Sequence, residues 1–393
     1  MVDTAAHKDR ALHDVERIPF NRLTLTGAEF DHLREAIAQN HISGDGVFSK
    51  RVHSMLEELL GVPKALLTTN CTHALEMAAL LLDVGPGDEV IMPSFTFVST
   101  ANAFVLRGAR PVFVDIRPDT LNIDERRVEE AITDRTRAIV PVHYAGVGCE
   151  MDRLLELAQP RNISIIEDNA HGLFGKYRGR NLGTFGALAT QSFHETKNVT
   201  CGEGGALLIN DPNLIEEAEI VREKGTNRSR FFRGQVDKYT WVDLGSSYLP
   251  SDLLAAFLFA QLSNYEAIQA RREAMWRTYA DGLADWAGNT GVGLPHVPEH
   301  CDQAFHMFYL IMPSLAARTR LIDYLKDNQI IAVFHYLPLH SSPFARESGF
   351  EGDCPVTSDI SDRLVRLPFF NGLTDDMLAR VIETITRFTG EAM

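Results

Sequence analysis

"DEVIMPSFTFVSTANAFVLRGARPVFVDI", residues 88–116, holds the pattern that decides the fold. Two short apolar runs, at 88–93 and 110–116, flank an amphipathic stretch of helix length. Each run predicts a buried strand, and the stretch between them predicts a helix. Strands joined through a helix pair in parallel, so this segment predicts one strand–helix–strand crossover.

The same alternation continues on both sides of this segment. Further apolar runs stand at KALLTT (64–69), RAIVPVHYAG (137–146) and ISIIEDNAHG (163–172), with helix-length stretches between them. Repeated crossovers predict an α/β fold with a doubly wound sheet that helices cover on both faces. Sheets of this kind bind ligands at the carboxyl ends of their strands.

The pattern changes after about residue 250. Residues 251–286 predict a long helix or a helix pair, and the remainder predicts a smaller α+β unit. We therefore expect a large domain over residues 1–262, with an N-terminal arm, and a small C-terminal domain over residues 263–393. No low-complexity linker separates the two, so we expect them to pack tightly.

Composition and charge exclude several classes of protein. The 393 residues carry a formal net charge of -15, which argues against nonspecific binding to nucleic acid or to an anionic membrane. The opening MVDTAAHKDRALHDVER lacks the apolar core of a signal peptide and no run is long enough to span a bilayer, so we expect a cytoplasmic protein. Five scattered cysteines predict reduced thiols, and no histidine or cysteine spacing predicts a metal site.

The strand predicted at 163–168 ends in Glu167 and Asp168, and His171 follows three residues later. The simplest interpretation is a turn, since aspartate and asparagine favour loop starts. An aspartate at this edge can also hold a cationic ring nitrogen, because it keeps a pyridinium protonated and electron-withdrawing.

Lys197 follows the strand-like run ALATQSF (187–193). A surface lysine is the default interpretation. A lysine can also form a Schiff base with an aldehyde where burial or a neighbouring charge lowers its pKa. Ser192 could then offer its hydroxyl to a phosphate, and the glycines of CGEGG (201–205) would let the backbone approach closely.

The start of a predicted helix in TTNCTHALEM (68–77) is a candidate phosphate cradle, because free N–H groups at Cys71 and Thr72 would attract an anion. An ordinary helix cap by Asn70 or Thr72 explains the same residues. Phe97 could stack on a cofactor ring or be a core residue.

Over nearly its whole length the chain resembles the sugar aminotransferases of the DegT/DnrJ/EryC1/StrS family. The resembling stretches are GDEVIMPSFTFVSTANAFVLRGA, IVPVHYAG, SFHETKN, REKGTNRSRFFRGQVDKYTW and VFHYLPLH. The resemblance implies the aspartate aminotransferase (type I) fold, pyridoxal 5′-phosphate (PLP) as cofactor, and residues 1–262 as the PLP-binding domain.

The resemblance also implies roles for single residues. Lys197 would form the Schiff base and Asp168 would pair with the pyridine nitrogen. The remaining cofactor contacts would be His171 to the ring hydroxyl, Phe97 stacked on the ring, and Cys71, Thr72 and Ser192 around the phosphate. Many relatives reach the partner subunit's phosphate through an asparagine in a YNYR segment. Here the aligned stretch is SSYL, which leaves Ser247 in that place.

The implied reaction has two halves. L-glutamate would convert PLP to pyridoxamine 5′-phosphate and leave as 2-oxoglutarate, and the amine would then pass to C4 of a dTDP-4-keto-6-deoxyhexose. Lys197 would shuttle the proton. The resemblance further implies a homodimer with its sites at the subunit interface.

Substrate contacts are predicted from two groups of residues. The basic stretch 222–238 could bind a diphosphate, although a solvated charge run explains it equally. Its cations are Arg222, Lys224, Arg228, Arg230, Arg233 and Lys238. Further candidates, from segments that the family places around the sugar, are His143, Tyr144, His194, Glu195, His335, Tyr336 and His340.

Several alternatives stay open. Amination at C3, and a glucose-like or galactose-like product, are not distinguished by the residues. A sugar dehydratase of the same fold has histidine in place of Lys197, and a noncatalytic regulatory homologue would not need the intact set of cofactor residues. A nicotinamide dehydrogenase lacks support because no GxGxxG follows the early strands.

Overall fold

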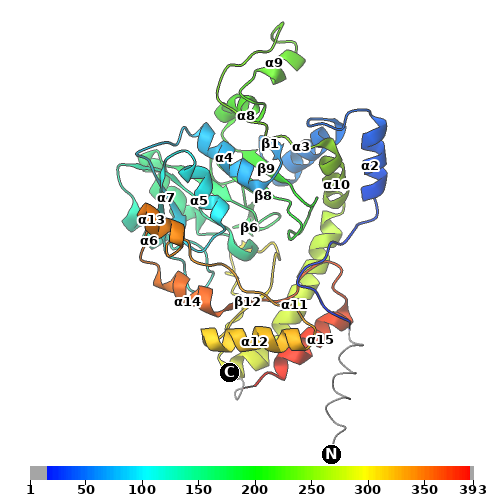
Figure 1. The fold of residues 1–393 in the computed structure, drawn as a ribbon, viewed down its shortest axis with the longest axis vertical. Coiled ribbons are helices and arrows are strands. Elements are labelled where there is room, and N and C mark those ends of the chain that lie inside the picture. Colours follow the sequence, from blue (N-terminus) through cyan, green and yellow to red (C-terminus); the bar gives the residue numbers. More distant parts are fainter. Residues whose placement is uncertain (1–15, 390–393) are drawn as a thin grey trace, which may run out of the picture.

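A computed structural model describes residues 16–389 of the chain (Figure 1). Most of the opening segment lies outside the described residues. The predictions that concern it, the missing signal peptide and the N-terminal arm, fall there. At the centre is a seven-stranded sheet with the order β1-β9-β8-β5-β4-β2-β3. Its strands are β1 (Lys64–Thr68), β2 (Glu89–Pro93), β3 (Arg110–Val114), β4 (Thr136–Ile139), β5 (Ser164–Asp168), β8 (Leu188–Ser192) and β9 (Gly205–Ile209).

The sheet is parallel except at one strand. β3, β2, β4, β5 and β8 pair in parallel, whereas β9 runs antiparallel to both β8 and β1. β1 therefore points the same way as β8, so the carboxyl ends of β1, β2, β5 and β8 meet at one edge. The doubly wound α/β fold expected from the sequence is confirmed, with strands where the five early apolar runs predicted them.

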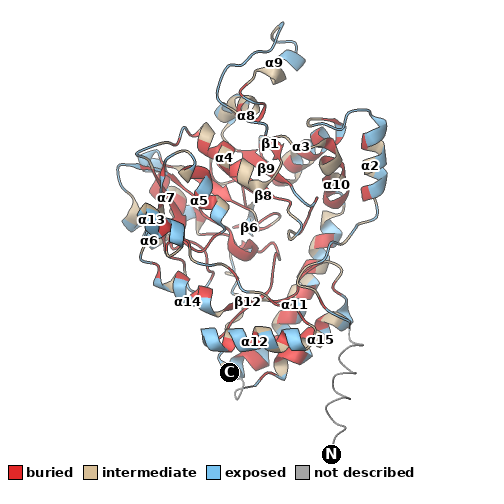
Figure 2. Ribbon diagram, viewed as in Figure 1, coloured by how far each residue is buried: buried red, intermediate tan, exposed pale blue. Residues whose placement is uncertain are grey.

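Helices cover both faces of this sheet, which explains why its strands are continuous apolar runs (Figure 2). Neighbouring residues of a strand face opposite ways, so in β1 Leu66 packs into one core while Ala65 and Leu67 pack into another. The first face carries α4 (Cys71–Leu81), α5 (Val98–Val105) and α8 (Ile215–Arg222). The other carries α3 (Val47–Leu60), α6 (Glu125–Ala131), α7 (Met151–Ala158) and α10 (Asp252–Leu262).

A second hydrophobic core lies in the C-terminal part. It is built from α11 (Tyr265–Thr290), α12 (Leu315–Asp327), α15 (Asp375–Thr386) and the antiparallel pair β11 (Tyr309–Ile311) and β12 (Leu364–Arg366). α10 and α11 form the helix pair that the sequence allowed, and the predicted domain boundary falls between them. Ile18 from the N-terminal stretch also belongs to this core, where it pairs with Ile330.

Smaller elements complete the molecule. α2 (Glu29–Ala38) packs on α10, whereas α9 (Arg228–Phe232) and the loops beside it project beyond α8 (Figure 1). β6 (Lys176–Tyr177), β7 (Arg180–Asn181) and β10 (Cys301–Asp302) form a small sheet, and α13 (Pro343–Ser348) and α14 (Pro355–Arg363) lead into β12. Within residues 16–389, no helix is long and apolar enough to cross a membrane, and no cluster of potential metal ligands is found.

Candidate active site

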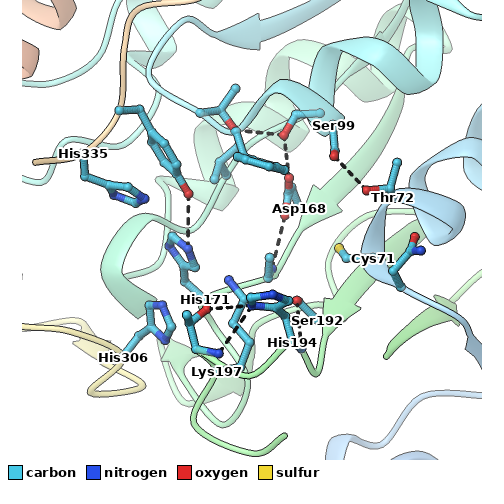
Figure 3. Close-up of a pocket in the computed structure, with 18 of the residues that line it drawn as sticks. Cys71, Thr72, Ser99, Asp168, His171, Ser192, His194, Lys197, His306 and His335 are labelled. Atoms are coloured by element: carbon cyan, nitrogen blue, oxygen red, sulfur yellow. Dashed lines mark hydrogen bonds between the residues drawn. The ribbon is translucent and has the colours of Figure 1, made fainter. Parts of the chain in front are cut away.

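A cavity of about 690 Å³ opens where the carboxyl edge of the sheet meets the C-terminal part of the chain (Figure 3). The sheet side supplies Asp168 at the end of β5, Ser192 at the end of β8, and the first residues of α4 and α5. The C-terminal side supplies residues 334–337, with His306 and Arg366. The cavity therefore lies where a doubly wound sheet is expected to bind its ligand.

Asp168 is held in place from one side. Thr100 Oγ1 donates to Asp168 Oδ2 at 2.7 Å, and Thr96 and Thr100 share a further hydrogen bond of 2.8 Å. The backbone N–H of Ala170 donates to Asp168 Oδ1 at 3.2 Å. No arginine, lysine or histidine pairs with this carboxylate among the described residues, so it is oriented without being neutralised. Such a carboxylate can accept a hydrogen bond from a protonated ring nitrogen of a ligand.

Lys197 lies in the loop after β8, where its N–H donates to the carbonyl of His194 at 2.9 Å. Burial lowers the pKa of the Lys197 amine to about 8, although the nearby Cys71 and Asp168 act in the opposite direction. About a tenth of the amine is then neutral at pH 7, far more than for an exposed lysine. A neutral amine is the form that attacks an aldehyde.

The first turn of α4 forms an anion cradle. Asn70 caps the helix by accepting from the His73 N–H at 2.8 Å, whereas no hydrogen bond within residues 16–389 uses the N–H groups of Cys71 and Thr72. Gly205 lets β9 approach this turn, since a Cβ there would stand 2.3 Å from the backbone carbon of Asn70. Free amides at the start of a helix suit a phosphate.

Side chains around the cradle add hydroxyl groups. Thr72 Oγ1 and Ser99 Oγ lie 2.7 Å apart, and Ser192 lines the same cavity (Figure 3). Burial raises the pKa of the Cys71 thiol to about 12, so Cys71 is an uncharged thiol that does not repel an anion.

Four histidines line the cavity, and three of them, His171, His306 and His335, lie close to one another (Figure 3). The rings of His171 and His306 stack with centroids 4.2 Å apart, and Tyr336 Oη lies 3.4 Å from His171 Nε2. Burial lowers the pKa of His171, His306 and His335 well below the usual value, so all three are neutral near pH 7.

Hydrogen bonding determines where the proton of one of these rings sits. Asn198 Nδ2 donates to Gln269 Oε1 and to the Ala304 carbonyl, so Asn198 Oδ1 accepts from His306 Nδ1 at 3.0 Å. In contrast, His171 Nδ1 is buried without a partner among the described residues. An unpaired buried ring nitrogen beside Asp168 and Lys197 fits a ligand with a polar ring substituent, as PLP has.

Most of the cofactor residues expected from the sequence meet in this cavity. Cys71, Thr72, Phe97, Asp168, His171, Ser192 and Lys197 line it, and so do His194, His335 and Tyr336 from the substrate set. Phe97 is the N-cap of α5 and keeps 57% of its surface exposed, so its ring is free to pack on a ligand.

Two candidates from the substrate set lie behind the cavity wall. His143 is fully buried, and its Nε2 lies 2.9 Å from Glu167 Oε2. Glu167 also accepts three backbone N–H groups, so this pair fixes the loop after β7. Tyr144 lies behind His335 and contacts its Nδ1 through the hydroxyl at 3.0 Å. Both residues support the wall and do not line it.

The other expected residues that do not line the cavity lie farther away. Arg228 pairs with Glu223 at 3.4 Å, and Arg230 pairs with Glu216. Ser247 is exposed beside Glu223, and Glu195 is exposed in the loop before Lys197. His340 is buried against Ser94. In the single chain Arg228, Arg230 and His340 therefore have local partners.

Among the cavity residues that the sequence did not single out are Ser99, Thr100, His306 and Arg366. Asn198, which accepts a hydrogen bond from His306 behind the cavity wall, was not singled out either. Thr100 and Ser99 come from the helix start that already contains Phe97, so their position near a strand end was a usable signal. His306 and Arg366 stand in apolar C-terminal runs whose position relative to the sheet depends on how the two parts pack.

Comparison with known proteins agrees with this geometry. A family model, described as the DegT/DnrJ/EryC1/StrS aminotransferase family, matches residues 24–386. An uncharacterized protein of Methanocaldococcus jannaschii is 33% identical over 349 residues, covering 87% of this chain and 90% of that one. The aminotransferase TlmJ from Streptoalloteichus hindustanus has a TM-score of 0.86 at 30% identity, covering 94% of this chain and 98% of TlmJ.

A putative sugar aminotransferase from Streptococcus pneumoniae, Spr1654, matches with a TM-score of 0.89 at 27% identity, over 96% of this chain and all of the other; it has been solved in PMP and PLP forms. The type I fold and the cofactor expected from the resemblance are confirmed. The chain belongs to the DegT/DnrJ/EryC1/StrS family and is a PLP-dependent sugar aminotransferase.

Proposed function

We propose that this enzyme transfers the amino group of L-glutamate to C4 of a dTDP-linked 4-keto-6-deoxyhexose, the activity of a dTDP-4-amino-4,6-dideoxygalactose transaminase. The observation that carries the transaminase chemistry is the meeting of Lys197, Asp168 and the free α4 amides in one cavity. The choice of sugar is supported by the long stretches REKGTNRSRFFRGQVDKYTW and VFHYLPLH. A cytoplasmic location is part of the same proposal.

PLP, when bound, supplies an aldehyde that accepts amino groups and a ring that withdraws electrons. The cradle at the start of α4 and Ser192 would hold its phosphate, and Asp168 would hold the ring nitrogen. His171 would face the ring hydroxyl through its unpaired nitrogen, and Phe97 would pack on the ring face. The polar groups that the cavity leaves unpaired thus match the polar groups of the cofactor.

Lys197 has two tasks in this proposal. Its neutral amine would hold the cofactor covalently at rest, and the same amine would be available as a base whenever it is not bonded to the cofactor. With a pKa of about 8, the free amine can both accept and return a proton near neutral pH. Because His171, His306 and His335 are neutral, they add no positive charge that would disfavour a protonated ring nitrogen beside Asp168.

A second copy of the chain is part of the proposal. Apolar side chains are exposed on the projecting segment around α9, among them Trp241 (78% exposed), Phe232 and Tyr239. On α2, Phe30 and Ile37 are exposed as well. Surfaces of this kind mark protein contacts. A homodimer would cover them and could bring the arginines of the projecting segment to the mouth of the partner's cavity.

The test uses dTDP-4-keto-6-deoxyglucose, L-glutamate and PLP with the purified enzyme. The expected result is one 2-oxoglutarate per aminated sugar, with NMR assigning the amine to C4 and its orientation. A dTDP-linked 3-keto sugar serves as the matched control. Amination of that control, with the 4-keto sugar unaltered, replaces C4 by C3 in the proposal. Two unaltered sugars reject a dTDP-hexose substrate.

A further inference from the structure

Hydrogen bonding behind the cavity wall fixes the ring of His306 in one tautomer. The series of bonds starts at the Ala304 carbonyl, which can only accept. Asn198 Nδ2 donates to this carbonyl at 2.6 Å and to Gln269 Oε1 at 3.0 Å. Asn198 Oδ1 is therefore the atom that lies 3.0 Å from His306 Nδ1, so Nδ1 carries the proton of the neutral ring. The other nitrogen, Nε2, keeps its lone pair and can only accept.

This lone pair has no partner in the fold. His306 lines the cavity with only 6% of its surface exposed, and no hydrogen bond to its Nε2 is found within residues 16–389. His143, also buried, uses both ring nitrogens, with Glu167 at 2.9 Å and the Cys149 amide at 3.1 Å. A buried acceptor without a donor costs free energy, and a ligand that supplies a donor removes that cost.

The surroundings of Nε2 determine which ligand group it can take. The His306 ring stacks on His171, with centroids 4.2 Å apart, and lies close to Lys197 (Figure 3). Burial, reinforced by neighbouring cations such as Lys197, holds the pKa of His306 well below its usual value, so the ring does not become a cation. A lone pair on a neutral ring repels a carboxylate or a phosphate and attracts an O–H group.

Among the groups that the proposed reaction brings, a sugar hydroxyl fits this acceptor. The amino donor carries carboxylates, and its amine is the group that reacts. Lys197, as the proton carrier, must reach C4 of the sugar, and His306 is bonded to the residue next to Lys197. Of the two ring carbons beside C4, C5 bears the methyl group and the ring oxygen, whereas C3 bears a hydroxyl. The C3 hydroxyl is thus the O–H group nearest to the reacting carbon.

We propose, resting on the dTDP-hexose function above, that His306 Nε2 accepts a hydrogen bond from the C3 hydroxyl of the ketosugar. His306 is then a substrate-binding residue, and Asn198 and Gln269 are positioning residues that keep its proton on Nδ1. A site that pairs a substrate hydroxyl in this way selects against an analogue that lacks the hydroxyl, since the acceptor would stay buried and unpaired.

The test compares dTDP-4-keto-6-deoxyglucose with its 3-deoxy analogue. Cofactor absorbance follows the second half-reaction, in which the ketosugar restores the PLP form of the enzyme from the PMP form, and gives kcat/KM for each sugar. Wild-type enzyme should prefer the parent sugar at least about 10-fold. Equal values for the two sugars overturn the inference alone. If neither sugar reacts, the dTDP-hexose substrate fails and the inference fails with it.

His306→Asn should abolish this preference. The new amide can still donate to Asn198, but it has no nitrogen in the place of Nε2. We expect kcat/KM to fall at least about 10-fold for the parent sugar and less than about threefold for the analogue. A purely structural defect would lower both sugars alike, and an unchanged preference therefore overturns the inference. His300→Asn is the matched control, because His300 contacts Glu150 outside the cavity and its loss should leave the preference intact.

Calorimetry on the PMP form gives a readout that does not depend on turnover. dTDP-6-deoxyglucose, which has a hydroxyl in place of the C4 ketone, should bind wild-type enzyme at least about fivefold more tightly than its 3-deoxy analogue. His306→Asn should bind the two alike. If this variant does not load the cofactor, His306→Phe, which keeps a flat ring against His171, takes its place. Equal affinities in the wild-type enzyme, or a preference that persists in the variant, overturn the inference.

Discussion

The cavity and the projecting segment around α9 differ in whether their positively charged side chains form ion pairs. In the projecting segment Arg228, Arg230 and Arg233 all pair with glutamates, and each arginine side chain is about half-exposed. In the cavity Lys197 and Arg366 have no acidic partner within hydrogen-bond distance among residues 16–389. A cluster of arginines in a sequence is therefore a weak sign of an anion site, because folding can pair each of them with an acid.

The same contrast holds between two adjacent carboxylates. Glu167 accepts three backbone N–H groups and contacts His143, so its acceptor capacity is filled. Asp168 accepts from Thr100 and Ala170 and still faces the cavity. Glu167 is thus occupied by contacts within the fold, whereas Asp168 faces the cavity and is the one we propose for the chemistry.

The largest effect is expected at Lys197. Lys197→Ala should lower turnover by at least about 1000-fold, because both the covalent link and the proton carrier are lost. Absorbance of the lysine-bound cofactor should disappear as well. Lys224→Ala, which removes a lysine paired with Glu223, should keep turnover at saturating sugar within about threefold of wild type, because a contact to the diphosphate affects KM and not the reacting groups. Comparable losses in the two variants would break the contrast between the regions.

Substitutions at the two carboxylates should separate chemistry from folding. Asp168→Asn should lower turnover about 100-fold or more with little change in Tm, because the ring nitrogen loses its charged partner. Glu167→Gln should instead destabilise the protein by about 3 kcal/mol, since a buried acceptor is replaced by a group that cannot serve three amides. Thermal melts and turnover on both variants give the comparison. Loss of stability in Asp168→Asn would contradict the assignment.

Lys197 also gives a pH dependence of known sign. Its pKa is lowered from 10.5 to about 8, so the neutral amine increases as pH rises through 8. Capture of PLP by the apoenzyme should therefore accelerate about tenfold between pH 7 and pH 9 and then level off. Stopped-flow absorbance measures this rate. A rate still rising tenfold from pH 9 to pH 10 would show an ordinary lysine.

Much of the fold and of the cofactor site could be predicted because the signals are local. Strand runs, the Asn70 cap and the residues that follow strand ends are signals carried by consecutive positions. Asp168, Lys197 and Cys71 could therefore be proposed from the sequence, and the structure brings them to one cavity. Arg366 was not predicted, because the residues near it in the sequence do not indicate that β12 lies beside the cavity. His143 was expected at the sugar because its segment resembles the family, yet its partner Glu167 lies 24 residues later. Which polar groups satisfy one another is a tertiary property.

The smallest effects are expected in the projecting segment. Arg228→Ala and Arg230→Ala should each change the free energy of unfolding by less than about 1 kcal/mol, because both ion pairs are half-exposed and screened by solvent. The informative measurement is KM for the dTDP-sugar at low and high salt, with glutamate saturating. A rise in KM of about fivefold that shrinks with added salt would show that these arginines leave their glutamates to bind the diphosphate. An unchanged KM would show that these arginines serve the structure of the segment and do not bind the sugar. The two regions would then differ in function as they differ in ion pairing.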